Sequence, residues 1–107
     1  MLCRHMFRKI LLLVCLCLPL PATAQIILII GDSLSAAYGM PVEQGWVALL
    51  QQRLDARGLD WQVVNSSISG DTTASGRARI GPAIEAHAPS LVVIELGGND
   101  GLRGLSL

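Results

Sequence analysis

Three short stretches of the sequence carry residue types that acyl transfer uses. They read Gly-Asp-Ser at 31–33, Ser-Gly-Asp at 69–71 and Gly-Gly-Asn-Asp at 97–100. Ser33 supplies a hydroxyl that could act as a nucleophile. Gly70 supplies a backbone N–H that no side chain shields, and Asn99 supplies a side-chain amide donor. Together with the N–H of Ser33, these two donors could surround an oxyanion.

Each of the three stretches directly follows a predicted strand. Ile26–Ile30 and Leu91–Leu96 are nearly unbroken apolar runs, typical of strands buried on both faces. Trp61–Ile68 is the remaining strand candidate, and helical segments separate the three. This alternating order predicts an α/β fold with a parallel sheet, flanking helices and right-handed crossovers. Because parallel strands end at the same edge, we expect the three stretches to meet there.

The first helical segment follows the Ser33 turn. Pro41 suits the first turn of a helix, and the apolar positions from Trp46 to Leu54 recur at helical spacing. We expect this amphipathic helix to lie on the sheet, with Trp46 in the core. Gly58 is a plausible stop at the C-terminal end.

The second helical segment follows Gly70. Thr72 and Thr73 can cap a helix that runs through Arg79. The Gly81-Pro82 pair is expected to interrupt it, because proline lacks the N–H that a helix interior requires, before a further turn or two. We expect Arg77 and Arg79 to be solvated charges on its outer face.

The turn after the first strand allows more than one role for its residues. Gly31 can adopt backbone angles closed to other residues, which would present Asp32 and Ser33 on a tight turn. Ser33 could then be a nucleophile, or it could cap the helix that follows.

Aspartates 32, 71 and 100 also lie at the predicted edge. We interpret them as turn and cap formers, with Asp32 and Asp100 bonding neighbouring loop amides. The alternative is a divalent cation site of the phosphoryl-transfer type. That alternative gives no role to the adjacent serine, glycine and asparagine. We therefore predict no metal and no cofactor.

The first 24 residues have the pattern of a secretory signal peptide. Arg4, Arg8 and Lys9 precede an apolar run over 10–20, and an A-x-A pattern ends at Ala24. Cleavage is expected before Gln25, giving a leader at 1–24, a mature domain at 25–107 and a periplasmic or secreted protein. The apolar run is shorter than a membrane span, so we expect no stable anchor after cleavage.

Removing this leader changes the composition of the chain. It takes away all 3 cysteines and three of the 8 basic residues but none of the 8 acids. The mature part can form no internal disulfide and is mildly acidic. This charge balance disfavours nucleic acid or an anionic lipid surface as a partner.

The sequence blocks resemble a known family. GDSLS at 31–35, the glycine of SISGD at 67–71 and GGND at 97–100 resemble the first three blocks of the SGNH (GDSL) hydrolases. Over 25–107 the chain looks most like the N-terminal part of the periplasmic bacterial acyl-CoA thioesterase, lysophospholipase and arylesterase group. The resemblance implies a flavodoxin-like three-layer α/β/α domain and hydrolysis of small acyl ester, thioester or lysophospholipid substrates. It also implies that Ser33 is the nucleophile and that Ser33, Gly70 and Asn99 form the oxyanion hole.

One block of that family is missing from the sequence as far as Leu107. The family histidine lies in a D-x-x-H block near the C-terminus, whereas His87 precedes the third strand. Six strand residues separate the two ends of that strand by about 20 Å. An aspartate of ordinary pKa is a poor general base for a serine. The resemblance thus implies a hydrolase whose Asp-His pair lies beyond this sequence; the alternative is a catalytically incompetent binding or partner-dependent module.

Overall fold

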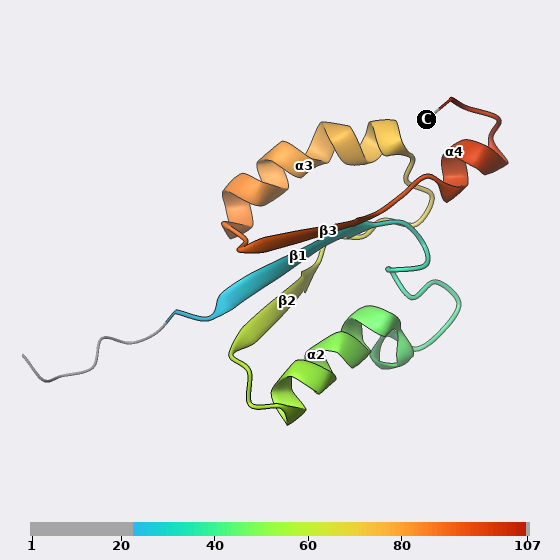
Figure 1. Ribbon diagram of the computed structural model, residues 1–107. Helices are drawn as coiled ribbons and strands as arrows, with labels where there is room; N and C mark the ends of the chain where they lie inside the picture. Colours follow the sequence, from blue (N-terminus) through green and yellow to red (C-terminus); the bar gives the residue numbers. More distant parts are fainter. Residues whose placement is uncertain (1–22, 107) are drawn as a thin grey trace, which may run out of the picture.

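The computed structural model describes residues 23–106, so the expected leader at 1–24 lies almost entirely outside the described residues. Strands β1 (Gln25–Gly31), β2 (Trp61–Asn65) and β3 (Leu91–Glu95) form one sheet in the order β2-β1-β3. Both pairings are parallel (Figure 1). The predicted α/β class with a parallel sheet is confirmed.

Strand β1 lies in the middle of the sheet. Leu28, Ile29 and Ile30 have no exposed surface because β1 has a neighbouring strand on each side and a helix over each face. This environment explains the unbroken aliphatic run in the sequence, since a strand covered on both faces has no polar face to present.

Helices cover the two faces of the sheet and make three layers. Helix α2 (Trp46–Ala56) covers one face, where Val47 packs against Ile27 and Ile29. Helix α3 (Thr73–His87) covers the other face (Figure 1). A short 3-10 helix, η1 (Val42–Gln44), precedes α2, and a short helix α4 (Gly98–Leu102) follows β3.

The length and apolar content of the described helices show whether one of them could cross a membrane. None of the helices within residues 23–106 combines the length and the apolar content of a transmembrane helix.

The start of the first helical segment differs from the prediction. Gly45 is extended and separates η1 from α2, so the helix begins at Trp46 rather than near Pro41. The prediction that Trp46 is a core residue is wrong, because its side chain is 38% exposed. Its indole Nε1 donates a hydrogen bond to Ser35 Oγ at 3.1 Å. Val47 is the buried residue of α2 instead.

The predicted break at Gly81-Pro82 is also wrong, because α3 continues through Pro82 to His87. Proline removes the hydrogen bond to the carbonyl of Ala78. Ala78 and Pro82 are both exposed, so water can solvate that carbonyl. The predicted cap at the other end of α3 is confirmed, since the Thr72 side chain accepts a hydrogen bond from the N–H of Ser75 at 3.2 Å.

Strand β2 ends at Asn65, three residues before the predicted end at Ile68. The Asn65 side-chain oxygen accepts a hydrogen bond from the N–H of Ser67 at 3.1 Å. This local bond turns the chain and replaces further strand pairing.

Candidate active site

The three predicted stretches meet at one edge of the sheet, and hydrogen bonds join them. The N–H of Ile68, in the loop after β2, donates to the carbonyl oxygen of Gly31 at the end of β1, at 3.0 Å. Asn99 Nδ2, after β3, donates to the carbonyl oxygen of Asp71 at 2.8 Å. The loops that contain Ser33, Gly70 and Asn99 are therefore held together, as the parallel topology predicts.

A side-chain hydrogen bond stabilises the Ser33 turn, but Asp32 makes it rather than Ser33. Asp32 Oδ1 accepts a hydrogen bond from the N–H of Leu34 at 3.0 Å, and the Asp32 carbonyl accepts one from the N–H of Ala36 at 2.9 Å. The hydroxyl of Ser33 makes no hydrogen bond to any group within residues 23–106, and the residue is only partly buried. The helix-capping role that the sequence left open for Ser33 is therefore absent, because the helices that follow, η1 and α2, have Pro41 and Gly45 at their N-caps and no side-chain cap.

Gly31 is needed at the end of β1 for a reason other than the predicted one. Its φ lies outside the left-handed region, so unusual backbone angles do not explain the glycine. A Cβ at this position would lie 2.6 Å from Ser35 Oγ and 3.0 Å from Glu95 Oε1. Glycine therefore makes room for Ser35 to pack beneath the turn.

Ser35 connects the Ser33 turn to three other elements. It is 1% exposed, and its hydroxyl donates to Glu95 Oε1 at 2.7 Å while accepting from Trp46 Nε1 at 3.1 Å. Asn65 Nδ2 donates to the Ser35 carbonyl at 2.8 Å. Sequence reasoning missed this network. The acidic Glu95 at the end of an apolar strand was a signal that could have pointed to it.

Gly70 and Asn99 have distinct local constraints. The φ of Gly70 is +87°, a left-handed conformation that favours glycine. Asn99 lies in α4 and gives one amide hydrogen to the Asp71 carbonyl. The same nitrogen carries a second hydrogen, which makes no hydrogen bond within residues 23–106.

The three aspartates at this edge are not equivalent. Asp100 is 2% exposed and accepts from the N–H and the hydroxyl of Thr73 at 2.8 and 2.6 Å. The hydroxyl bond, followed by the N–H bond, lowers the pKa of Asp100 below its ordinary value. Asp71 forms an ion pair with Arg79. The prediction that Asp32 and Asp100 bond nearby amides is confirmed. Within residues 23–106, no three His, Cys, Asp or Glu side chains are grouped to hold a metal ion.

Arg79 is not the solvated charge that the sequence predicted. Its side chain is 23% exposed, and its Nε donates to Asp71 Oδ2 at 2.6 Å. The two terminal nitrogens donate to the backbone carbonyls of Ser66 and Gly31, the latter at 3.2 Å. Arg77, by contrast, is exposed as predicted.

His87 is the last residue of α3 and lies four residues before β3 begins. This end of the helix is at the opposite edge of the sheet from α4 (Figure 1). Within residues 23–106, therefore, no histidine lies at the edge that carries Ser33.

Comparison with known proteins identifies the family. Residues 29–107 match the GDSL-like lipase/acylhydrolase family, and the chain belongs to it. The chain is 57% identical over 102 residues to esterase TesA of Pseudomonas aeruginosa, covering 92% of the chain and 51% of that protein. It is 49% identical over 83 residues to the Escherichia coli K12 thioesterase 1/protease 1/lysophospholipase L1, covering 78% of the chain and 38% of that protein.

A solved structure gives the same result for the fold. The crystal structure of AlinE4, an esterase of the SGNH-hydrolase family, superposes with a TM-score of 0.72 and 40% identity, covering 81% of this chain and 47% of that one. The resemblance to SGNH hydrolases is thus confirmed. The chain spans about half the length of TesA and of AlinE4, and less of the E. coli relative.

Proposed function

We propose that this protein is an exported hydrolase of carboxylic ester or thioester bonds and that Ser33 is its nucleophile. The observation that carries this proposal is the Ser33 hydroxyl, which makes no hydrogen bond within residues 23–106 and lies at the sheet edge that also carries Gly70 and Asn99. Relatives named as an esterase and as a thioesterase support the same reaction class.

In this mechanism Ser33 Oγ attacks the carbonyl carbon of the substrate and forms a C–O bond. The electron pair of the C=O π bond moves to the oxygen, and the oxyanion accepts hydrogen bonds from Ser33 N–H, Gly70 N–H and Asn99 Nδ2. Collapse of this intermediate expels the alcohol or thiol and leaves an acyl-serine. Water then hydrolyses the acyl-serine to the free acid and regenerates the hydroxyl.

The proton of the Ser33 hydroxyl needs a base in this mechanism. We assign that base to an Asp-His pair in sequence beyond Leu107, because the family resemblance implies such a block and His87 lies at the opposite edge of the sheet. His87 therefore has no part in the proposed reaction.

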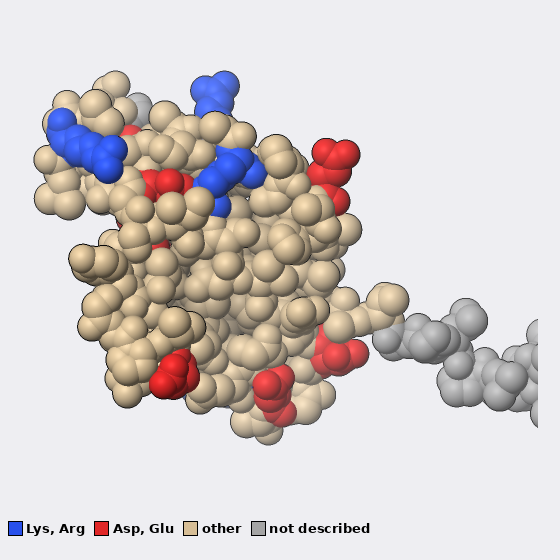
Figure 2. Space-filling model, turned by 180° about the vertical axis from the view of Figure 1, so that it is seen from behind, with Lys and Arg blue, Asp and Glu red and all other residues tan. Residues whose placement is uncertain are grey.

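We assign small acyl esters, thioesters or lysophospholipids as the substrate class, following the names of the relatives. Nucleic acid is not an expected partner, because residues 25–107 carry more acids than bases. The face drawn in Figure 2 agrees with this expectation, since its arginine side chains form no continuous basic patch. The signal-peptide pattern of residues 1–24 supports export to the periplasm.

The serine can be tested directly with the protein at the full length that its gene encodes. We expect Ser33→Ala to reduce hydrolysis of a short p-nitrophenyl ester and of an acyl thioester on the order of a million-fold. Ser90→Ala, which removes an exposed hydroxyl before β3, should leave both rates unchanged. Hydrolysis that survives Ser33→Ala would mean that another residue is the nucleophile.

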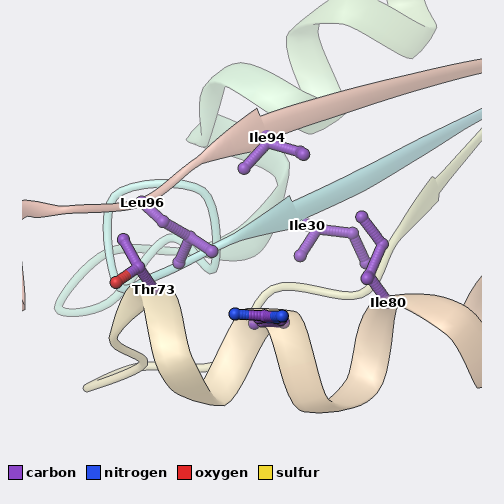
Figure 3. A pocket seen from close by; sticks show the side chains of 7 residues that line it. Ile30, Thr73, Ile80, Ile94 and Leu96 are labelled. Carbon is purple, nitrogen blue, oxygen red and sulfur yellow. The ribbon is translucent and has the colours of Figure 1, made fainter. Parts of the chain in front are cut away.

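A partner-dependent module is the second candidate function, and an apolar groove favours it. The groove has a volume of about 320 Å³ and lies between α3 and β3. Figure 3 shows Ile94 and Leu96 on one side and Ile80 of α3 on the other. Ile94 is 60% exposed on β3, which within residues 23–106 pairs with another strand on one side only. A further polypeptide strand that pairs with this edge would cover Ile94.

The state of the purified 107-residue chain tests the second candidate. A soluble monomer that unfolds cooperatively would contradict a module that depends on a partner to fold. Insoluble or molten material would indicate that the domain needs additional polypeptide at the β3 edge.

A further inference from the structure

Arg79 links segments that lie far apart in the sequence. It projects from the second turn of α3 back toward the edge of the sheet where Ser33 lies. Its guanidinium donates to the carboxylate of Asp71 and to the carbonyls of Ser66 and Gly31. These acceptors belong to the segments that carry the proposed catalytic groups.

Each acceptor has a defined place relative to those groups. Gly31 lies two residues before Ser33 and ends β1. Ser66 begins the loop that leads to Gly70, and Asp71 directly follows Gly70. The guanidinium therefore bridges the nucleophile turn and the loop of the Gly70 oxyanion donor.

We propose that Arg79 is a positioning residue that holds the Gly70 N–H at a fixed place relative to Ser33 Oγ. This role rests on the proposed function. A guanidinium suits it, because its donors lie in one rigid plane and can bind several acceptors at once. The Asp71 carboxylate, which is 12% exposed, adds a charge-assisted hydrogen bond that fixes the plane.

The effect of losing Arg79 follows from the bonds that remain. Gly31 still accepts from Ile68 N–H, and Asp71 still accepts from Asn99, so the loops stay joined without the guanidinium. Without the guanidinium, the distance between the Ser33 turn and the Gly70 loop becomes less well defined. Because the oxyanion exists only in the transition state and intermediate, this change lowers kcat and has little effect on KM.

The experiment compares Arg79→Lys with Arg77→Lys, an exposed position on the same helix, in the protein at the full length that its gene encodes. A lysine ammonium can bind one of the three acceptors well but not all of them. We expect Arg79→Lys to lower kcat for a short p-nitrophenyl ester roughly 10- to 100-fold with KM within about threefold. Arg77→Lys should match the wild type.

A second variant keeps the test decisive if Arg79→Lys does not fold. Asp71→Asn retains an acceptor for Arg79 but removes the charge. We expect it to decrease kcat less than Arg79→Lys does, with KM unchanged.

Chemical rescue gives a further test. Added ethylguanidinium should restore part of the kcat of Arg79→Ala, which a purely structural role does not predict.

Two results separate failure of this inference from failure of the proposed function. A Ser33-dependent enzyme whose kcat is unchanged by Arg79→Lys, or whose KM alone rises, would overturn the positioning role and leave Ser33 as the nucleophile. A wild-type protein without Ser33-dependent hydrolysis would overturn the proposed function and the role of Arg79 with it.

Discussion

The side-chain nitrogen of Asn99 donates a hydrogen bond to the carbonyl oxygen of Asp71 at 2.8 Å. A carbonyl can only accept, so this bond selects the amide orientation that turns Nδ2 toward the Gly70 loop. Asp71 directly follows Gly70, and the two proposed oxyanion donors from β2 and β3 are therefore physically connected. A displacement of either loop changes the position of both donors.

Asn99→Ala should reduce catalysis more than substrate binding. It removes one oxyanion donor together with the bond to Asp71, and we expect kcat to fall roughly 10²- to 10³-fold with little change in KM. Steady-state kinetics with a short p-nitrophenyl ester measure both constants. Gln62→Ala, which removes an exposed amide from β2, is the control and should have wild-type kinetics. A raised KM with unchanged kcat would contradict an oxyanion role for Asn99.

Gly31→Ala should destabilise the fold because its Cβ would lie 2.6 Å from Ser35 Oγ. We expect urea unfolding to give a loss of about 1–3 kcal/mol, typical of overpacking. Adding Ser35→Gly removes the two nearest obstructing atoms, Ser35 Oγ and Cβ, and should recover part of that loss.

Gly81→Ala is the matched control for Gly31→Ala. Apart from its chain neighbours and the backbone of its own helix, no described atom lies within 4 Å of the added Cβ, and Gly81 is inside α3. This substitution should be neutral or slightly stabilising. Equal losses at positions 31 and 81 would show that steric contact with Ser35 is not the cause.

Asp100 should stabilise the protein in a pH-dependent way. Hydrogen bonds from Thr73 lower its pKa in the folded state, so the ionised carboxylate favours folding above the ordinary value near 4. This contribution is lost as the pH falls through the lowered pKa. Asp100→Asn should therefore be less stable than the wild type at pH 7, with a difference that shrinks in acid.

Urea unfolding of both proteins at neutral and acidic pH measures this difference. Asp60→Asn, at an exposed loop position, is the control for the general effect of removing one carboxylate. A stability difference that does not change with pH would mean that ionisation of Asp100 contributes nothing.

The 107-residue chain by itself should have almost no esterase activity. Its described part has no histidine at the edge that carries Ser33, and losing the histidine of a serine triad lowers turnover on the order of a million-fold. Hydrolysis rates for this chain and for a longer gene product that carries the D-x-x-H block should differ accordingly. Equal rates would place the base within these 107 residues, and each described aspartate would then need testing by substitution.

Much of the fold could be predicted from the sequence because its determinants are local. The aliphatic run around Leu28 reflects burial on both faces of β1, and the Thr72 cap bonds a backbone N–H three residues away. The meeting of the loops that carry Ser33, Gly70 and Asn99 also follows from local patterns, because strand order alone brings the ends of parallel strands to one edge.

The remaining features depend on hydrogen-bond partners that lie far away in the sequence, and no local pattern reveals them. The apolar periodicity placed Trp46 in the core, whereas its indole nitrogen bonds Ser35 eleven residues earlier. The acceptors of Arg79 include Gly31, 48 residues away. Spacing along a helix identifies a face, but it does not say which polar atoms another element presents to that face.

The hydrogen bond from Ser35 to Glu95 has a consequence for the order of folding, because it closes a separation of 60 residues. Strands β1 and β2 can pair before Glu95 reaches the sheet, but the turn that carries Ser33 lacks this support until β3 has joined. We therefore expect the Ser33 turn to become ordered late in folding. Partial unfolding that begins at β3 should disrupt the nucleophile turn while the β1–β2 pair persists.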